Sequence, residues 1–587
     1  MLALTSGTAT IGERGWRPAL WQVWLATAVL LALIALPQIA SFAPGDPDDF
    51  MRLLQVRDWL AGQSWWDVRQ YRMDPPAGAD MHWSRLVDLP LAAFLLAFGA
   101  LLPEPWASAA AMSVVPLLQL ALAMVLLRSI MRRLGAGKGA TIAVTALPLL
   151  FPLLVDAFMP LRIDHHGWQA LCTLAATLAM LRGGWRNACA AGAIMAIALT
   201  ISLEALPLAA VLGAIFALRF IRFGRREHEA YLVGLALAAP LLFAATRPWN
   251  AFASAWCDQL SWPHFLALAA AGACAAASRI VPGQNHAAGR LVALVPVAVA
   301  AGLAILLPLG ACAVDPFAAM DPVLRSEWLS RVPEGMPVWS QPASVAAMLL
   351  WTIAIIIAGA RLAVRGARDK AARERWAMLA LAALGAGALS LLVLRAGLIA
   401  QLLAVPFAAV LVAHYLPRAR AIGSLTGRLL ATMACLLLAT PTLASAALKP
   451  LDGWDAKPSP AAGRVGPCDL SRLAALPNGQ LFAPFDLGPE ILARSGHSVV
   501  AGPYHRNQRA MRAVLDAFTG APDDARAIIT SESADYLVAC VSADRLGTFA
   551  EAGESNLADA LLAGRAPAWL APVPGFERGA LRVWQVR

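Results

Sequence analysis

Between residues 19 and 447, long apolar runs follow one another with few breaks, and they limit what the chain can fold into. Of its 587 residues, 59% are hydrophobic and only 14% are charged, so most of the apolar surface must face lipid or other buried helices. Runs of roughly 17 to 25 apolar residues are long enough to cross a bilayer as helices. We therefore expect about thirteen spans, near residues 19–40, 106–131, 139–158, 167–182, 187–203, 205–221, 229–247, 262–279, 290–312, 344–361, 376–394, 397–416 and 428–447.

Positive charges gather in the short loops between alternate runs. Because cytoplasmic loops carry an excess of Lys and Arg, these loops are assigned to the cytoplasm. The assigned residues include Arg182, Arg186, Arg222, Arg225, Arg365 and Arg420. An odd number of spans then places the N-terminus in the cytoplasm and the C-terminal region outside. The net charge of +10 does not indicate nucleic-acid binding, because no basic stripe carries interleaved aromatic residues.

The assignment of spans and loops divides the chain into two domains. Residues 1–447 are expected to form a transmembrane domain with long external loops at 41–105 and 313–343, and residues 448–587 a small extracytoplasmic domain. In the second domain, short apolar runs at 481–483, 498–501, 536–539 and 581–586 predict strands, and 489–494 and 507–519 predict helices. The expected fold class is an α-helical polytopic membrane protein with a C-terminal α/β domain.

Cysteine usage and composition suggest where the protein resides. Most of the eight cysteines lie in apolar runs and are expected to be packing residues. Cys468 and Cys540 lie in the C-terminal domain and could form a disulfide if that domain is extracytoplasmic. The richness in Ala, Arg and Gly is typical of a high-GC bacterium. We therefore expect a multi-pass protein of the bacterial inner membrane.

Three carboxylates, Asp46, Asp48 and Asp49, stand within one short stretch of the first external loop. A helix N-terminus needs only one capping carboxylate. The cluster is therefore either a cap alone or a cap combined with a metal or donor site. Arg52 follows on the same predicted helix, and its guanidinium could bind a donor phosphate.

A second group lies at an external span boundary, in the segment from Arg162 to Gln169. Asp164 and His166 are both metal-ligand types, and Arg162 could meet phosphate. Taken alone, such a cluster is more often a solvated helix cap. Its acidic companions on the same side of the membrane favour a functional site.

Two single residues extend this set. Glu334 lies in a long external loop, and long loops without regular structure are often functional. Arg395 interrupts an apolar run, where a bare guanidinium is costly. Arg395 therefore either extends toward the interface or pairs with an anion such as a lipid phosphate.

In the C-terminal domain, Tyr504, His505 and Arg506 follow directly after a predicted strand. Strand ends in α/β domains commonly carry ligands. A simple helix cap by Asn507 is the alternative.

Taken in chain order, these motifs resemble the catalytic subunits of membrane oligosaccharyltransferases, whose glycosyltransferase fold is called type C. That family opens its first external loop with Asp-Pro and a following Arg, and later has a Tyr-Pro-x-Gly turn. An acidic pair, Asp-His-His in archaeal members, a mobile Ser-Val-x-Glu loop with a following Pro, and an intramembrane Arg come next. The similar residues are Asp46, Pro47 and Arg52; Pro76 and Gly78; Asp164, His165 and His166; Ser330, Val332, Glu334 and Pro337, with Arg331 inserted; and Arg395.

The resemblance implies transfer of a sugar or oligosaccharide from a polyprenyl-phosphate or diphosphate donor to an extracytoplasmic acceptor, assisted by Mn²⁺ or Mg²⁺. Candidate catalytic residues are Asp46, Asp49, Asp164 and Glu334, and candidate metal ligands are Asp46, Asp48, Asp164 and His166. Candidate donor-phosphate residues are Arg395, Arg162 and Arg52, and candidate acceptor or domain contacts are Tyr504, His505 and Arg506.

One departure from the family concerns the acceptor. The Trp-Trp-Asp-Tyr-Gly motif, which reads the acceptor sequon in the family, is absent from residues 448–587. The acceptor, whether glycan, lipid or protein, is therefore left open. The alternative function is a polytopic transporter or flippase for a lipid-linked or polar substrate. Transporters usually place ionisable groups near mid-span between repeats, whereas these carboxylates cluster in external loops.

Overall fold

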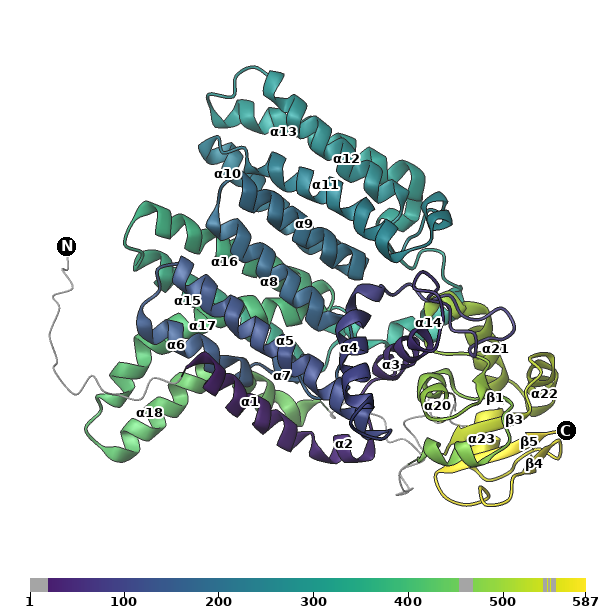
Figure 1. Cartoon of the computed structure of the whole chain (residues 1–587). Coiled ribbons are helices and arrows are strands. Elements are labelled where there is room, and N and C mark those ends of the chain that lie inside the picture. The colour runs from purple at the N-terminus through teal and green to yellow at the C-terminus, as the bar shows by residue number, and fades with distance from the viewer. Residues whose placement is uncertain (1–18, 453–467, 542–545, 547–548, 550–555) are drawn as a thin grey trace.

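The structure of the chain is a computed structural model that describes residues 19–452, 468–541, 546, 549 and 556–587. A large helical bundle carries the C-terminal α/β domain against one of its ends (Figure 1). Within the described residues, seven helices are long and apolar enough to cross a membrane, so the chain is a multispanning membrane protein. They are α5 (Trp106–Arg133), η3 with α10 (Leu203–Phe223), α11 (Glu227–Thr246), α13 with η6 (Ala287–Ala313), α15 (Ala343–Arg365), α16 (Lys370–Leu392) and α17 (Ala396–Arg420).

The remaining apolar runs fold into shorter or broken helices. The run at 139–158 is divided among α6 (Lys138–Ala146), η2 (Leu147–Leu150) and α7 (Pro152–Ala157), because proline interrupts helical hydrogen bonding. The others are α1 (Leu20–Ile34), α8 (His166–Arg182), α9 (Trp185–Ile201) and α12 (Trp262–Ala277). A pair bent by 90°, α18 (Leu425–Leu438) and α19 (Thr442–Leu448), would make an eighth span. The count of thirteen stays a prediction.

Helix α17 forms the centre of the bundle, and α13 lies at its margin. In the most apolar window of each helix, 78% of α17 is buried inside the protein but only 6% of α13. Close approach of α15 to α17 requires Gly359, because a Cβ there would lie 2.6 Å from the Phe407 Cβ. Small residues allow helix backbones to approach closely in membranes.

The first external loop is ordered and contains its own helices. These are α2 (Leu36–Ser41), α3 (Pro47–Leu60), η1 (Arg85–Val87) and α4 (Asp88–Gly99). Asp46 caps α3 through its side chain, and Pro47 occupies the first turn, where a missing N–H costs nothing. The residues from Asp49 to Val56 of α3 are all buried. Most of helix α3 is therefore packed inside the protein and not exposed on its surface.

The C-terminal domain is a five-stranded mixed sheet with order β2-β1-β3-β5-β4. Strands β1 (Gln480–Phe482), β2 (Ser498–Val499) and β3 (Tyr536–Cys540) are parallel, and β5 (Leu581–Val586) and β4 (Leu570–Pro572) complete the sheet in antiparallel fashion. Its helices are α20 (Gly488–Arg494), α21 (Gln508–Thr519), α22 (Pro522–Ser531) and α23 (Leu557–Leu562). The prediction of an α/β domain is confirmed. Strand β4 and helices α22 and α23 were not predicted.

Both long external loops pack on this domain. Arg72 in the first loop donates hydrogen bonds to the carbonyl oxygens of Leu492 (2.8 Å), Ser495 (2.9 Å) and His497 (3.1 Å). In the other loop, α14 (Pro322–Glu327) contributes Leu324 to the apolar core of the domain. The C-terminal domain thus packs against the loops that carry the candidate site.

The described residues form two disulfides. The predicted Cys468–Cys540 bridge is confirmed, with Cα atoms 5.8 Å apart. A second bridge, Cys257–Cys312, joins the segments before α12 and after α13, with Cα atoms 5.1 Å apart. The expectation that most cysteines outside the C-terminal domain pack in apolar runs did not predict this bridge.

Candidate active site

The site is built around the segment from Arg162 to His166, which leads into α8. Asp49 lies fully buried beneath it and accepts hydrogen bonds from the backbone N–H groups of Ile163 (2.7 Å) and Asp164 (3.1 Å). Asp49 also contacts the Arg162 guanidinium at 3.3 Å. This carboxylate therefore fixes the backbone that presents Asp164.

The three carboxylates of the first loop have separate positions. Asp46 accepts the N–H of Asp48 at 3.0 Å and contacts the Arg162 guanidinium at 2.9 Å. Burial and the Asp164 and Asp46 charges raise the pKa of Asp48 well above its usual value. Asp48 is thus the member of the three that feels the charge of Asp164 and forms no ion pair among the described residues.

Asp164, His165 and His166, called here the pocket cluster, bring one carboxylate and two imidazoles together. Their ligand atoms all lie within 4.8 Å of one another. Asp164 Oδ1 is 2.5 Å from His165 Nδ1, and Asp164 Oδ2 is 3.1 Å from His166 Nε2. Although burial opposes ionisation, the charges of His165 and His166 hold the pKa of Asp164 well below its usual range. A carboxylate and imidazoles in this arrangement can ligate a divalent transition-metal ion.

Arg395 occupies the N-cap position of α17, and its guanidinium contacts two carboxylates. Its Nε contacts Glu334 Oε2 at 2.9 Å, and its Nη1 forms an ion pair with Glu204. The backbone N–H of Arg395 also donates to the Glu334 carbonyl at 3.1 Å. The same two carboxylates approach His166, at 3.8 Å for Glu204 and 3.9 Å for Glu334. Arg395 is therefore joined electrostatically to the pocket cluster.

A cavity of about 190 Å³ opens between these groups. Its lining combines charged and apolar side chains and consists of Leu153, Asp156, Ala157, Arg162, Asp164, His166, Gly167, Glu334, Leu394, Arg395 and Leu398. Segments predicted separately from the sequence, those of Asp164, Glu334 and Arg395, thus meet at one cavity.

Glu204 was not predicted as a site residue. In the sequence, a single Glu two residues after Ser202 has the pattern of an ordinary turn. Its contacts with Arg395 and His166 exist only after α9 and α10 fold. No local signal in the sequence distinguishes Glu204.

Arg52 does not line the cavity. It is buried inside the first loop, where its guanidinium contacts Asp88 at 3.0 Å and lies 4.4 Å from the Trp83 ring centre. Its positive charge still contributes to lowering the pKa of Asp164, whose burial opposes that shift. Its placement suits support of the loop better than direct contact with donor phosphate.

The candidate residues of the C-terminal domain face the membrane domain. Tyr504 is buried, with its ring 5.5 Å from that of Trp83, and burial together with the Asp48 and Asp46 charges raises its pKa well above the usual value. His505 and Arg506 contact Asp258, each at 2.7 Å. Asp258 lies in the segment before α12, so these are contacts between the domains.

Comparisons with solved structures identify the fold. An archaeal oligosaccharyltransferase, AglB from Archaeoglobus fulgidus in complex with an inhibitory peptide and a dolichol-phosphate, superposes with a TM-score of 0.64 at 15% sequence identity, covering 94% of this chain and 72% of that one. The chain has the oligosaccharyltransferase fold. The same enzyme tethered to an acceptor peptide with an NVT sequon gives 0.61 at 14% identity, over 95% and 74% of the two chains. Its complex with Zn and sulfate gives 0.58 at 14% identity, over 95% and 72%.

Comparison of sequences alone does not identify this fold. No protein-family model matches the chain, and no curated protein matches its sequence. The predicted resemblance to membrane oligosaccharyltransferases is nevertheless confirmed at the level of the oligosaccharyltransferase fold. At 14–15% identity, the order of the motifs along the chain carried more information about the fold than overall sequence similarity.

Proposed function

We propose that the chain is a membrane glycosyltransferase. It moves a sugar or oligosaccharide from a polyprenyl-phosphate or polyprenyl-diphosphate donor to an extracytoplasmic acceptor. The observation that carries this proposal is the cavity that combines Arg395 and Arg162, the carboxylate and imidazole of Asp164 and His166, and an apolar wall.

The lining of the cavity suits both parts of a lipid-linked donor. One guanidinium group can bind two phosphate oxygens at once, and both Arg162 and Arg395 line the cavity. Leu153, Leu394 and Leu398 form an apolar wall where a prenyl chain can leave toward the membrane. The archaeal enzyme with this fold has been solved in complex with a dolichol-phosphate.

The donor set also fits a divalent cation. Asp164, His166 and Asp48 would hold the cation. His165 belongs to the same group of ligand atoms as Asp164 and His166, and the Glu204 carboxylate lies 3.8 Å from the His166 ring. Imidazole ligands favour a transition-metal ion such as Zn²⁺ over Mg²⁺, whereas the carboxylate ligands also suit Mn²⁺. When bound, the cation would neutralise charge on the leaving phosphate. The archaeal enzyme has been solved in complex with Zn and sulfate.

The chain's own residues position the reaction. Asp49 fixes the backbone of Asp164, and Asp46 holds Arg162 at the cavity. Arg395 supplies a fixed positive charge for the donor phosphate, and Glu204 holds its guanidinium in place. Glu334 either joins the cation ligands or orients the acceptor, since its loop reaches both Arg395 and His166.

Two features support an extracytoplasmic site. Disulfides form in oxidising compartments, and both Cys257–Cys312 and Cys468–Cys540 lie in segments that the charge pattern assigns to the outside. In a bacterium, the site would face the periplasmic side of the inner membrane.

The test is mass spectrometry of lipid-linked sugars and surface glycans in cells with and without the protein. Loss of the protein, or its replacement by Asp164→Ala, should leave the donor intermediate unconsumed and remove a sugar from one acceptor. Transfer by the purified protein should stop with a chelator and return with Mn²⁺. If the donor instead crosses the bilayer unmodified and no acceptor gains mass, the chain is a flippase and the proposal is wrong.

A further inference from the structure

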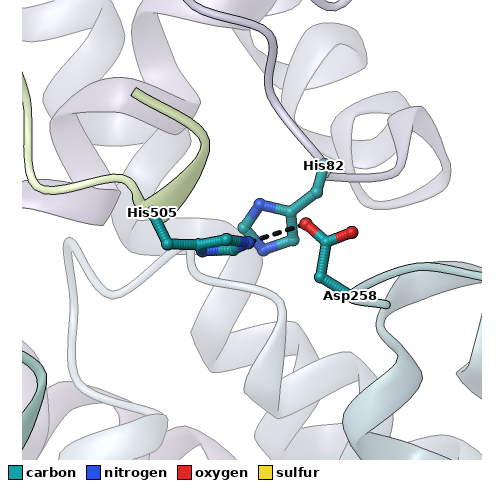
Figure 2. Close-up of side chains that lie close together, drawn as sticks. All are labelled: His82, Asp258 and His505. Carbon is teal, nitrogen blue, oxygen red and sulfur yellow. Dashed lines mark hydrogen bonds and ion pairs between the residues drawn. The ribbon is translucent and has the colours of Figure 1, made fainter. Parts of the chain in front are cut away.

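A second cluster of ligand-type side chains lies where the domains meet. His82 comes from the first external loop, Asp258 from the segment before α12, and His505 from the C-terminal domain, and Figure 2 shows the three side chains directed toward one another. We call them the interdomain cluster. Their candidate ligand atoms all lie within 4.8 Å of one another, and His505 Nε2 is 2.7 Å from Asp258 Oδ2.

The carboxylate of this cluster is held rigidly. Arg506 donates two hydrogen bonds to Asp258, each of 2.7 Å, so both carboxylate oxygens are fixed in orientation. Arg506 is itself fixed by Asp80 at 2.9 Å and by the Trp256 ring, 4.3 Å from its guanidinium carbon. Metal-ligating carboxylates are characteristically oriented by such outer hydrogen bonds.

A simple interdomain hydrogen bond would explain His505 and Asp258, but it would leave His82 without a role. The His82 ring centre lies 4.8 Å from that of His505. Among the residues that the structure describes, no partner forms a hydrogen bond with an imidazole nitrogen of His82. One ring nitrogen of His82 therefore lies within 4.8 Å of the candidate ligand atoms of Asp258 and His505 and is available to a ligand.

We propose that His82, Asp258 and His505 bind a divalent transition-metal ion of the Zn²⁺ class, separate from any cation of the pocket cluster. Two imidazoles and one carboxylate are the ligand types that Zn²⁺ prefers, whereas Mg²⁺ and Ca²⁺ prefer oxygen alone. Because each ligand comes from a different segment, the ion cross-links the first loop, the segment before α12 and the C-terminal domain. This site does not depend on the proposed glycosyltransferase activity.

The test uses the full chain in lipid nanodiscs, with Asp164→Ala and His166→Ala introduced together to remove the pocket cluster. After chelation and dialysis, this background protein should bind one equivalent of Zn²⁺ tightly and no Mg²⁺. Zn²⁺ should also raise its thermal midpoint, because a ligand that binds only the folded state stabilises it. Co²⁺ in place of Zn²⁺ should give the visible absorption of an ion with nitrogen ligands.

Further substitution of His82→Gln and His505→Gln should weaken Zn²⁺ binding at least tenfold and abolish the thermal shift. Glutamine can still donate a hydrogen bond to Asp258, so the domain contact is retained while the imidazole ligands are lost. His286→Gln, at an exposed histidine, is the matched control and should bind Zn²⁺ like the background.

The proposal is overturned if the background protein binds no Zn²⁺, or if the substituted protein binds it equally well. The chelated proteins should share one thermal midpoint, which shows that the substitutions leave the fold intact. Should the double substitution unfold the chain, His82→Gln alone decides the question, because the His82 side chain forms no hydrogen bond within the described residues that the substitution would remove. Undiminished Zn²⁺ binding by that variant would also reject the site.

Discussion

The pocket cluster and the interdomain cluster contain the same kinds of side chain but differ in construction. Asp164, His165 and His166 are consecutive in the chain, and their segment borders a cavity of about 190 Å³ with cationic and apolar walls. His82, Asp258 and His505 come from three distant segments and hold two domains together. The proposed roles follow this difference in surroundings, a chemical role for the first cluster and a structural role for the second.

The largest effect is expected for Asp164→Ala. Removing this carboxylate should lower sugar transfer by about 1,000-fold, an order typical of losing a group that stabilises developing charge. The thermal midpoint should fall less than in Asp258→Ala, because Asp49 still fixes this backbone and the imidazole partners of Asp164, unlike the Arg506 guanidinium, can become neutral. Transfer is measured by mass spectrometry of the acceptor. Glu104→Ala, which removes an exposed partner of Arg57, is the control, and equal losses in the two variants would contradict the assignment.

Arg395→Ala should come next, with a loss of about 100-fold in transfer. Arg395→Lys should fall between this variant and the unmodified protein, because lysine keeps the charge but cannot bind phosphate as a planar fork. The kinetics are measured with purified lipid-linked donor. If alanine and lysine behave alike, shape and not charge at Arg395 controls the reaction.

Glu204→Gln tests a residue that only the structure identifies. The neutral amide can accept a hydrogen bond from Arg395 but cannot form the ion pair, so transfer should fall about tenfold, as for other residues that orient a functional group. The loss should appear mainly as a higher KM for the donor, with a smaller change in kcat. A change confined to kcat would instead place Glu204 among the groups that act in the transition state.

Asp258→Ala should act on stability more than on chemistry. It leaves His505 and Arg506 without their common carboxylate at a largely buried contact, which should cost about 3 kcal/mol. The thermal midpoint measures this loss. Glu327→Ala, which breaks an exposed pair with Arg331, should cost under about 1 kcal/mol. If Asp258→Ala reduces transfer as strongly as Asp164→Ala while the midpoint stays unchanged, the division of roles between the clusters is wrong.

Much of the fold could be predicted because its causes are local. Apolar runs predict helices in lipid, and alternating apolar segments predicted the sheet of the C-terminal domain. The number of spans is less accessible, because prolines divide the run at 139–158 into three short helices. Helix breaks depend on neighbours that a hydropathy pattern does not contain.

The candidate site was predictable to the extent that its residues are unusual where they stand. Arg395 was identified because a charge within an apolar run is costly, Asp164 because it lies in a cluster of metal-ligand types, and Glu334 because it lies in a long loop. The different positions of Asp46, Asp48 and Asp49 were not predicted, since successive residues in a helical turn point in different directions. Glu204 and His82 gain their partners only through tertiary contacts, and nothing in their own sequence neighbourhoods distinguishes them.

The Cys257–Cys312 disulfide has a consequence for how the protein matures. It joins the segment before α12 to the segment after α13, and Cys257 is the immediate neighbour of Asp258. The residue that anchors the C-terminal domain is thus fixed by a bond that forms only after export to an oxidising compartment. Oxidation of the early-translated hairpin should therefore precede docking of the last domain, and chains kept reduced should carry that domain loosely tethered.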